Sequence, residues 1–276
     1  MSIGVSIKKI LALARIILID GLRRHALLGL LALSLAAEGG GLLFFDFINR
    51  DIGRASSDFI FSVSWTVGFI FLFFHAVQVM AWDEERRVIH TLMAPPLARD
   101  EYVIGVFSGL GALLLLLNLI LGTVGWGTLM LIKHMVDPAY FSHFSHAFYF
   151  YSWLGLFAME LMMLAVIVLF SGLVRGGFPV LLVSICFYLI CSGLPVVRES
   201  MAQRFESGDH SAPVGLLQAL AAFFPDFGRL DFKNAVVCAT CQPATIHMLM
   251  SFGLCLTYTV LVLGLACTVY RRRDLQ

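Results

Sequence analysis

Two clusters of side chains in the sequence could bind a metal ion or form a disulfide bond. Cys238 and Cys241 are separated by two residues, a spacing used by zinc sites and by redox pairs. Haem attachment needs a histidine directly after the second cysteine, and no histidine stands there. A complete zinc site needs a second pair of ligands, which the sequence does not supply at the usual spacing. The pair is therefore predicted to be a disulfide or two free thiols.

The second cluster consists of His134, His143 and His146, which lie among aromatic residues such as Tyr140 and Phe144. Aromatic side chains are enriched where a membrane meets water. We favour histidines at that interface, with a metal site as the alternative. No cofactor is expected.

Catalytic patterns are missing from the sequence. No serine–histidine–aspartate set, metal-binding helix motif or acid pair at hydrolase spacing stands out, and no Gly-x-x-x-x-Gly-Lys-Ser/Thr phosphate loop is present. The glycine clusters at 39–41 and 176–177 are not followed by lysine. The chain is therefore predicted to be neither an enzyme nor its own ATPase, and an intramembrane enzyme is the rival hypothesis.

Isolated polar side chains occur within long apolar stretches. An acidic side chain inside a membrane is costly and is usually functional or paired, which draws attention to Glu38 and Glu160. We treat these acids and Asn118 as candidates for lining a translocation path. The alternative is hydrogen bonding between helices, which is favoured for Asn118, His75 and Gln78.

The elements that must position these residues are membrane helices. Of the 276 residues, 59% are hydrophobic and 13% are charged, whereas soluble domains carry about 25% charged residues. The mean hydropathy is +0.89. A net charge of +1 without a basic patch gives no reason to expect nucleic-acid binding. The sequence begins without the pattern of a secretory signal, so we expect its first residues to be retained.

We predict an all-α membrane protein with six transmembrane helices, because a span needs roughly 20 mostly apolar residues. The predicted spans are 26–47, 59–82, 103–132, 153–174, 178–197 and 246–270. With both termini in the cytoplasm, twelve of the nineteen Lys and Arg residues lie in cytoplasmic segments, close to span ends. We therefore expect cytoplasmic termini, with a permease domain over 26–270 and a short tail over 271–276.

Two segments flanking the spans have a pattern of their own. Residues 1–25 place apolar side chains at helical spacing among Lys and Arg, which predicts an amphipathic helix in the membrane interface. A cytoplasmic extension of the first span is the alternative. The outer loop over 198–245 is apolar in its middle but short and contains Pro225, so a short outer helix or re-entrant piece is expected there.

The charged sequence DEERRVIHTLMAPPLARDEY, residues 83–102, separates the second and third spans. Asp83 can cap a helix, and Glu84 and Glu85 suit its positive end. Pro95 ends the helix, because the residue before a proline disfavours helical geometry. We predict a short helix on the cytoplasmic face, with an ordinary connecting loop as the alternative.

This loop resembles the coupling region of ATP-binding-cassette type 2 permeases, the membrane subunits of many bacterial ABC exporters. That family shows an acidic residue, then Gly-Thr-Leu, then Pro-x-x-Arg, an aromatic residue and a glycine. The matching residues are Glu84 or Glu85, Thr91, Leu92, Pro96, Arg99, Tyr102 and Gly105. His90 and Val106 depart from the usual glycine and lysine.

Three further segments carry the same resemblance. TVYRRRDL over 268–275 is similar to the family's usual C-terminal end, and FPDFGRLDFKNAV over 224–236 is similar to the outer loop of a subset. ALARIILIDGLRRHALL over 12–28 resembles the entry helix. The resemblance covers the whole chain.

The resemblance implies an exporter permease in the bacterial cytoplasmic membrane, working with soluble ABC ATPase subunits that bind ATP and magnesium. It implies a second permease as well, identical or homologous. The residues it assigns to ATPase coupling are Glu84, Glu85, Arg86, Arg87, Thr91, Leu92, Pro96 and Arg99.

Few charges lie within the spans, which favours a lipid-like, glycan, peptide or other amphipathic cargo over a small ion. Membrane lipid and an extracytoplasmic protein are further partners to expect. The alternative function is a non-transporting membrane anchor, or a mechanically coupled assembly subunit of a larger envelope complex.

Overall fold

The structure is a computed structural model that describes residues 3–23, 25–44, 51–85, 98–206, 224–238 and 242–272. Within these residues the chain is helical and contains no strand. Five helical segments are long and apolar enough to cross a membrane. They are Ile52–Ala81, Arg99–Met135, His146–Leu173, Gly177–Arg198 and Thr245–Arg272. The prediction of an all-α membrane protein is confirmed at this level.

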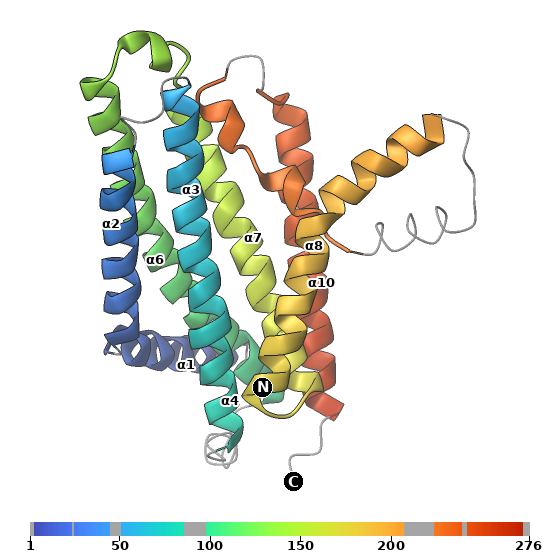
Figure 1. Ribbon diagram of the computed structural model, residues 1–276. Helices are drawn as coiled ribbons and strands as arrows, with labels where there is room; N and C mark the ends of the chain where they lie inside the picture. Colours follow the sequence, from blue (N-terminus) through green and yellow to red (C-terminus); the bar gives the residue numbers. More distant parts are fainter. Residues whose placement is uncertain are drawn as a thin grey trace.

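The first predicted span falls on α2 (His25–Phe44). Its continuous apolar part, Leu27–Gly41, is shorter than the roughly 20 residues that a span requires. Figure 1 shows α2 standing upright in the bundle beside α6 (Arg99–Met135). Five helices are therefore long and apolar enough to span a membrane, and α2 as a sixth span remains a prediction.

The second predicted span begins earlier than expected and continues further. Helix α3 (Ile52–Ile70), the π-helical segment η2 (Phe71–Ala76) and α4 (Val77–Glu85) follow one another without a break. The prediction that a separate helix begins at Asp83 is wrong. No proline or glycine interrupts residues 77–85, so the acidic residues extend the existing helix.

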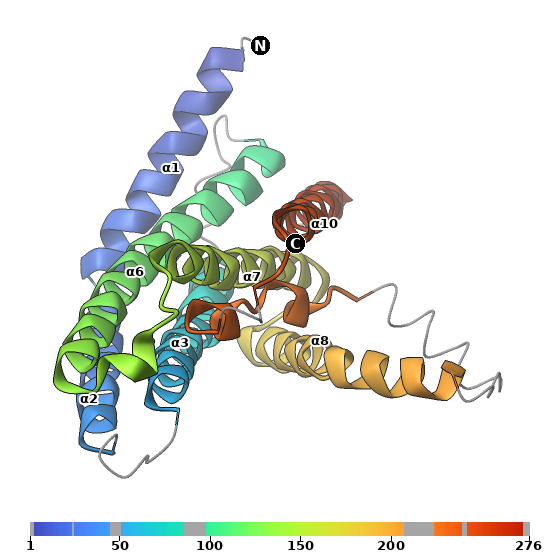
Figure 2. The ribbon, with the colours of Figure 1, turned by 90° about the horizontal axis from the view of Figure 1, so that it is seen from above.

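The remaining helices agree with the prediction to within a few residues, apart from two ends. Helix α7 (His146–Leu173) begins seven residues earlier than the predicted start at 153. The reason is Ser145, whose hydroxyl accepts a hydrogen bond from the backbone N–H of Phe148 at 3.5 Å and caps the helix. Helix α8 (Gly177–Glu206) continues through Pro195 and leaves the bundle sideways (Figures 1 and 2).

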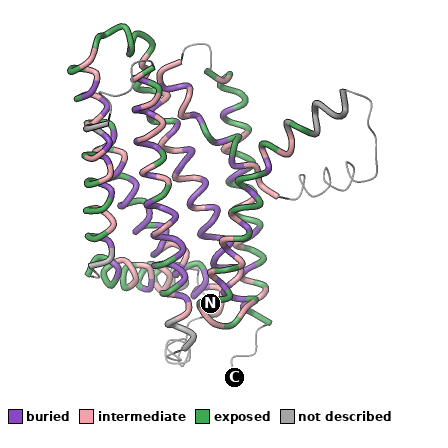
Figure 3. Tube along the Cα trace, viewed as in Figure 1, coloured by how far each residue is buried: buried purple, intermediate pink, exposed green. Residues whose placement is uncertain are grey.

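Helix α7 forms the centre of the bundle. It packs against α3, α6, α8 and α10 (Thr245–Arg272), and Figure 2 shows it between them when the bundle is seen along its axis. Figure 3 shows that buried residues concentrate along α3, α6 and α7. Met162, Met163 and Leu164 on α7 are almost completely buried.

Helix α1 (Ile3–Arg23) lies across one end of the bundle, where the C-terminal end of α10 also lies (Figure 1). We call this the α1 end. α1 packs on α6 at a crossing made close by Gly105 and Gly109. A Cβ atom on Gly109 would lie 2.9 Å from Cβ of Ile17 and 3.0 Å from the carbonyl oxygen of Ala14. Small residues allow two helix backbones to approach in this way.

The outer loop contributes two short 3₁₀ turns at the opposite end, η4 (Phe227–Leu230) and η5 (Lys233–Val236), in addition to η3 (Pro138–Phe141) between α6 and α7. η4 and η5 pack against α7. In residues 224–238 the expected outer helix is therefore present only as 3₁₀ turns. The rest of the predicted re-entrant piece lies outside the described residues.

The close α1–α6 crossing predicts the effect of a bulky side chain at Gly109. Gly109→Leu should destabilise the protein by about 1–3 kcal/mol, because the added atoms overpack the contact with Ile17. Thermal unfolding of the detergent-solubilised protein measures this. Gly127→Leu on the same helix is the control, since a Cβ atom there meets nothing within 4 Å. Equal melting temperatures for the two variants would contradict the crossing.

Candidate functional site

At the α1 end, the first residue of α6 binds the last turn of α10. The Arg99 guanidinium donates hydrogen bonds from Nη1 to the carbonyl oxygens of Arg271, at 2.7 Å, and Tyr270, at 3.3 Å. The final carbonyls of a helix have no intrahelical partner and carry partial negative charge. A cation in this position therefore caps α10.

The two residues after Arg99 extend this contact to α10 and α1. Asp100 accepts two hydrogen bonds of 2.8 Å from Nε of Arg271 and also pairs with Nη2 of the same side chain. Glu101, which is 5% exposed, accepts a hydrogen bond from the backbone N–H of Ala98 at 2.9 Å and lies 3.9 Å from Nζ of Lys9 on α1. We call Lys9, Arg99, Asp100, Glu101 and Arg271 the helix-end junction.

The junction joins segments that are far apart in the sequence. The C-terminal residues Tyr270 and Arg271 belong to one segment that carries the family resemblance, and Arg99 belongs to another. Sequence reasoning treated Arg99 as a contact for an ATPase and missed its contact with α10. The sequence did contain a signal for this contact, namely opposite charges at the ends of two apolar helices. Asp100 and Glu101 lie in the first turn of α6, and Arg271 and Arg272 lie in the last turn of α10.

The other predicted coupling residues lie beside this junction in the sequence. Glu84 and Glu85 are the last two residues of α4, whose end lies at the α1 end (Figure 1). The remaining members fall outside the described residues: Arg86, Arg87, Thr91, Leu92 and Pro96. The segment over 86–97 therefore leaves from α4 and returns to α6 at the end of the bundle that carries the junction.

The predicted path residues Glu160 and Asn118 form a closed contact between helices. Glu160 on α7 and Asn118 on α6 are both 0% exposed, and Nδ2 of Asn118 donates a 2.5 Å hydrogen bond to Oε2 of Glu160. The carboxyl group also lies against Gly68 of α3, where a Cβ atom would collide with it. This geometry is that of an inter-helix hydrogen bond, and the path role stays a prediction.

Glu38, the third candidate for the path, is 3% exposed on α2. Its Oε2 accepts a hydrogen bond from Thr128 of α6 at 3.3 Å. It therefore also contributes to a contact between two helices. Of the other polar residues, His75 is buried within η2, whereas Gln78 is exposed.

A cavity of about 350 Å³ lies between α3, α7, α8 and the outer loop, and sequence reasoning did not identify it. Trp65 and Tyr188 line it and are joined by a hydrogen bond of 3.1 Å from Nε1 of Trp65 to the tyrosine hydroxyl. Serine and threonine hydroxyls, the Asp231–Lys233 ion pair and several apolar side chains also line it. We call it the aromatic cavity, and its mixed walls suit an amphipathic molecule.

The histidine and cysteine clusters hold no metal group among the described residues. His146 accepts a hydrogen bond from Trp126 at 3.3 Å through Nδ1, and its ring meets Phe144 edge to face at 5.0 Å. His146 therefore lies among aromatic side chains, and its position at a membrane interface stays a prediction. Cys238 is disulfide-bonded, and Cys241 lies outside the described residues.

The Asn118–Glu160 contact predicts a specific order of stabilities. Asn118→Leu should cost about 1–3 kcal/mol, because it leaves the buried carboxyl group without its donor. Adding Glu160→Met should recover part of that loss, since replacing both polar partners is far less costly than removing one. Thermal unfolding of both variants in detergent measures the coupling between the two positions.

Thr123→Val is the matched control, because this residue on α6 is exposed and its hydroxyl donates a hydrogen bond to the carbonyl of Ile120 within its own helix. It should leave stability nearly unchanged. If the double variant is as unstable as Asn118→Leu alone, the two side chains are not coupled and the closed contact is wrong.

No family model matches the sequence, and no curated protein matches it. The case for a function therefore depends on the chain's own residues and their arrangement.

Proposed function

We propose that the chain is the membrane-embedded permease subunit of an ATP-driven ABC exporter. The observation that carries the proposal is the helix-end junction, which binds α1, α6 and α10 together at one end of the bundle. The predicted coupling loop covers residues 83–102, and its middle part, 86–97, begins and ends at that same end. Movement of a partner bound to this segment would act on three connected helices.

The junction is suited to transmitting movement. Arg99 is one of the predicted coupling residues and lies just after residues 86–97, and its planar guanidinium binds two backbone carbonyls of α10. Backbone carbonyls cannot change rotamer, so a displacement of the start of α6 displaces the end of α10. An ATPase subunit bound to 86–97 would therefore shift the membrane helices as it closes on ATP and magnesium.

The proposed orientation places the α1 end in the cytoplasm and the outer loop on the extracytoplasmic side of the bacterial cytoplasmic membrane. The distribution of Lys and Arg supports this. The disulfide at Cys238 supports it as well, because disulfides persist in oxidising compartments and are rare in the cytoplasm.

The exposed apolar surface supports the remaining parts of the topology. On α1, Leu11 is 62% exposed and Ile16 is 61% exposed, although α1 is packed on α6. Membrane lipid would cover these side chains if α1 lies in the interface. We include α2 as the sixth span, since it stands upright in the bundle and packs on α6 (Figure 1).

The proposed assembly contains two ATPase subunits and a second permease. Only 22% of the apolar window in α8 and 22% of that in α10 is buried within the chain. These faces are therefore available to lipid or to another permease. An extracytoplasmic partner would meet the outer loop.

The aromatic cavity supports an amphipathic cargo of lipid-like, glycan or peptide character. Trp65 and Tyr188 offer flat apolar faces, while hydroxyl groups and Lys233 offer polar contacts. Glu38, Asn118 and Glu160 do not line this cavity. In this proposal they act on the path only if the assembly opens the helix contacts in which they lie.

The alternative function, a non-transporting anchor or assembly subunit, is favoured by one observation. The helix contacts around Glu160 are closed, with the carboxyl group fully buried. Such a subunit would use the same helix-end junction to pass force to a partner. Association with an ATPase together with cargo movement distinguishes the exporter from this alternative.

The proposed contact with an ATPase predicts the effect of reversing a charge in the coupling segment. Arg87→Glu should leave the chain inserted in the membrane but lower the copurifying, vanadate-sensitive ATP hydrolysis at least about tenfold. The reason is that reversing one partner of a charge pair at an interface costs several kcal/mol. Hydrolysis is measured on the affinity-purified complex, and the copurifying chain must carry a phosphate-loop sequence.

Arg175→Glu is the matched control, because Arg175 is an exposed arginine between α7 and α8, in another predicted cytoplasmic segment. It should retain the hydrolysis. If the unchanged protein purifies without any ATPase, or if Arg87→Glu keeps full activity, the proposed function fails.

A further inference from the structure

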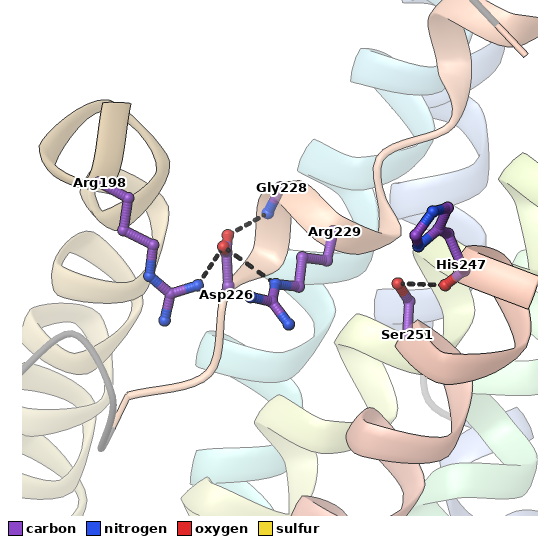
Figure 4. Close-up of polar contacts among 6 residues, drawn as sticks. All are labelled: Arg198, Asp226, Gly228, Arg229, His247 and Ser251. Atoms are coloured by element: carbon purple, nitrogen blue, oxygen red, sulfur yellow. Dashed lines mark hydrogen bonds and ion pairs between the residues drawn. The ribbon is translucent and has the colours of Figure 1, made fainter. Parts of the chain in front are cut away.

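A second cavity, of about 300 Å³, lies between the end of the α8 span, η4 and α10. Three charged residues line its upper wall. Arg198 of α8 pairs with Asp226, and Nε of Arg229 lies 3.6 Å from the same carboxylate. Figure 4 shows the two arginines approaching Asp226 from opposite sides, with Arg229 between Asp226 and Ser251 of α10. We call this the arginine cavity.

The charges in the arginine cavity do not cancel. Among the described residues that line the cavity, two arginines accompany one carboxylate, so this part of the lining has a net positive charge. Asp226 is further occupied by the backbone N–H of Gly228, which donates to it at 3.0 Å. Each guanidinium carries five N–H donors, and the side chain of Arg229 is 57% exposed. Arg229 can therefore donate to an anionic oxygen without leaving Asp226.

The cavity lies at the depth where lipid headgroups are expected. The apolar segment of α8 runs from Gly177 to Arg198, which is 22 residues. At 1.5 Å per residue this spans about 33 Å, close to the hydrocarbon thickness of a bilayer. Arg198 is the last residue of this apolar segment, so we expect it to lie at the boundary of the apolar layer.

The lower part of the same cavity is apolar. Met162 of α7 and Leu254, Cys255 and Tyr258 of α10 line it. Leu254 is 57% exposed, and the apolar surface continues along α10 with Leu261, which is 66% exposed. A hydrocarbon chain attached to a group held by the arginines would lie along this surface.

We propose that the arginine cavity binds the anionic headgroup of a membrane lipid, with Arg198 and Arg229 holding the headgroup oxygens and α10 contacting the acyl chain. Basic pockets between membrane helices bind anionic headgroups in this manner. A free phosphate offers the same oxygens to the arginines but leaves the apolar part of the cavity unfilled. The proposal requires insertion in a membrane and does not require ATP-driven transport.

Native mass spectrometry of the detergent-solubilised full chain tests the site. The chain is mixed with phosphatidylglycerol or with phosphatidylcholine of identical acyl chains. Phosphatidylglycerol should be retained at least about fivefold more, because one arginine near a headgroup contributes about that factor. Arg229→Gln should abolish the difference. A melting temperature equal to that of the unchanged protein shows that this variant is folded.

Arg54→Gln is the matched control, since Arg54 is an exposed arginine that donates a hydrogen bond to Asn234 of the outer loop at 3.2 Å and lines neither the arginine cavity nor the aromatic cavity. It should keep the preference for phosphatidylglycerol. Equal retention of the two lipids by the unchanged protein overturns the proposal. An undiminished preference in folded Arg229→Gln also overturns it, as does displacement of the lipid by an equal concentration of inorganic phosphate.

Discussion

The start of α6 holds the end of α10 through two neighbouring residues that act on different groups. Arg99 binds the terminal carbonyls of α10, and Asp100 binds the Arg271 side chain. An ion pair this exposed contributes little to stability, since solvent screens it. The contact instead fixes where α10 ends relative to α6, and α6 in turn packs on α1, α2, α3 and α7. Fixing the start of α6 therefore also fixes the end of α10.

The interior of the bundle shows a second constraint, the placement of a carboxyl group away from both water and lipid. Glu160 is completely buried and meets Asn118 on one side and Gly68 on another. A side chain on residue 68 would displace the carboxyl group. Helices α3, α6 and α7 therefore all pack around this one polar contact. Such contacts specify which helix faces meet, because the bilayer itself provides little drive for one helix to bind another.

Much of the architecture could be predicted from the sequence because runs of apolar residues define membrane helices. The limits of those helices could not, since caps and tertiary contacts decide them. Ser145 starts α7 early, and the acids at 83–85 continue a helix that they were expected to begin.

The candidate site was less accessible to sequence reasoning. Arg99 was identified as important, but its partners are carbonyl groups of residues 270 and 271, and no sequence pattern names a backbone acceptor so far away. The arginine and aromatic cavities are formed where the outer loop folds back against α7, α8 and α10. That return of the loop depends on three-dimensional packing and leaves no periodic signal.

The central claim is that the segment over 86–97 binds an ATPase subunit at the α1 end. Incorporating a photoreactive amino acid at His90 and irradiating living cells tests this most directly. The account predicts a crosslink to a soluble chain that carries a phosphate-loop sequence, and no such crosslink from the same amino acid placed at Asp231 in the outer loop. Crosslinking of the ATPase from position 231 instead of position 90, or from neither, would contradict it.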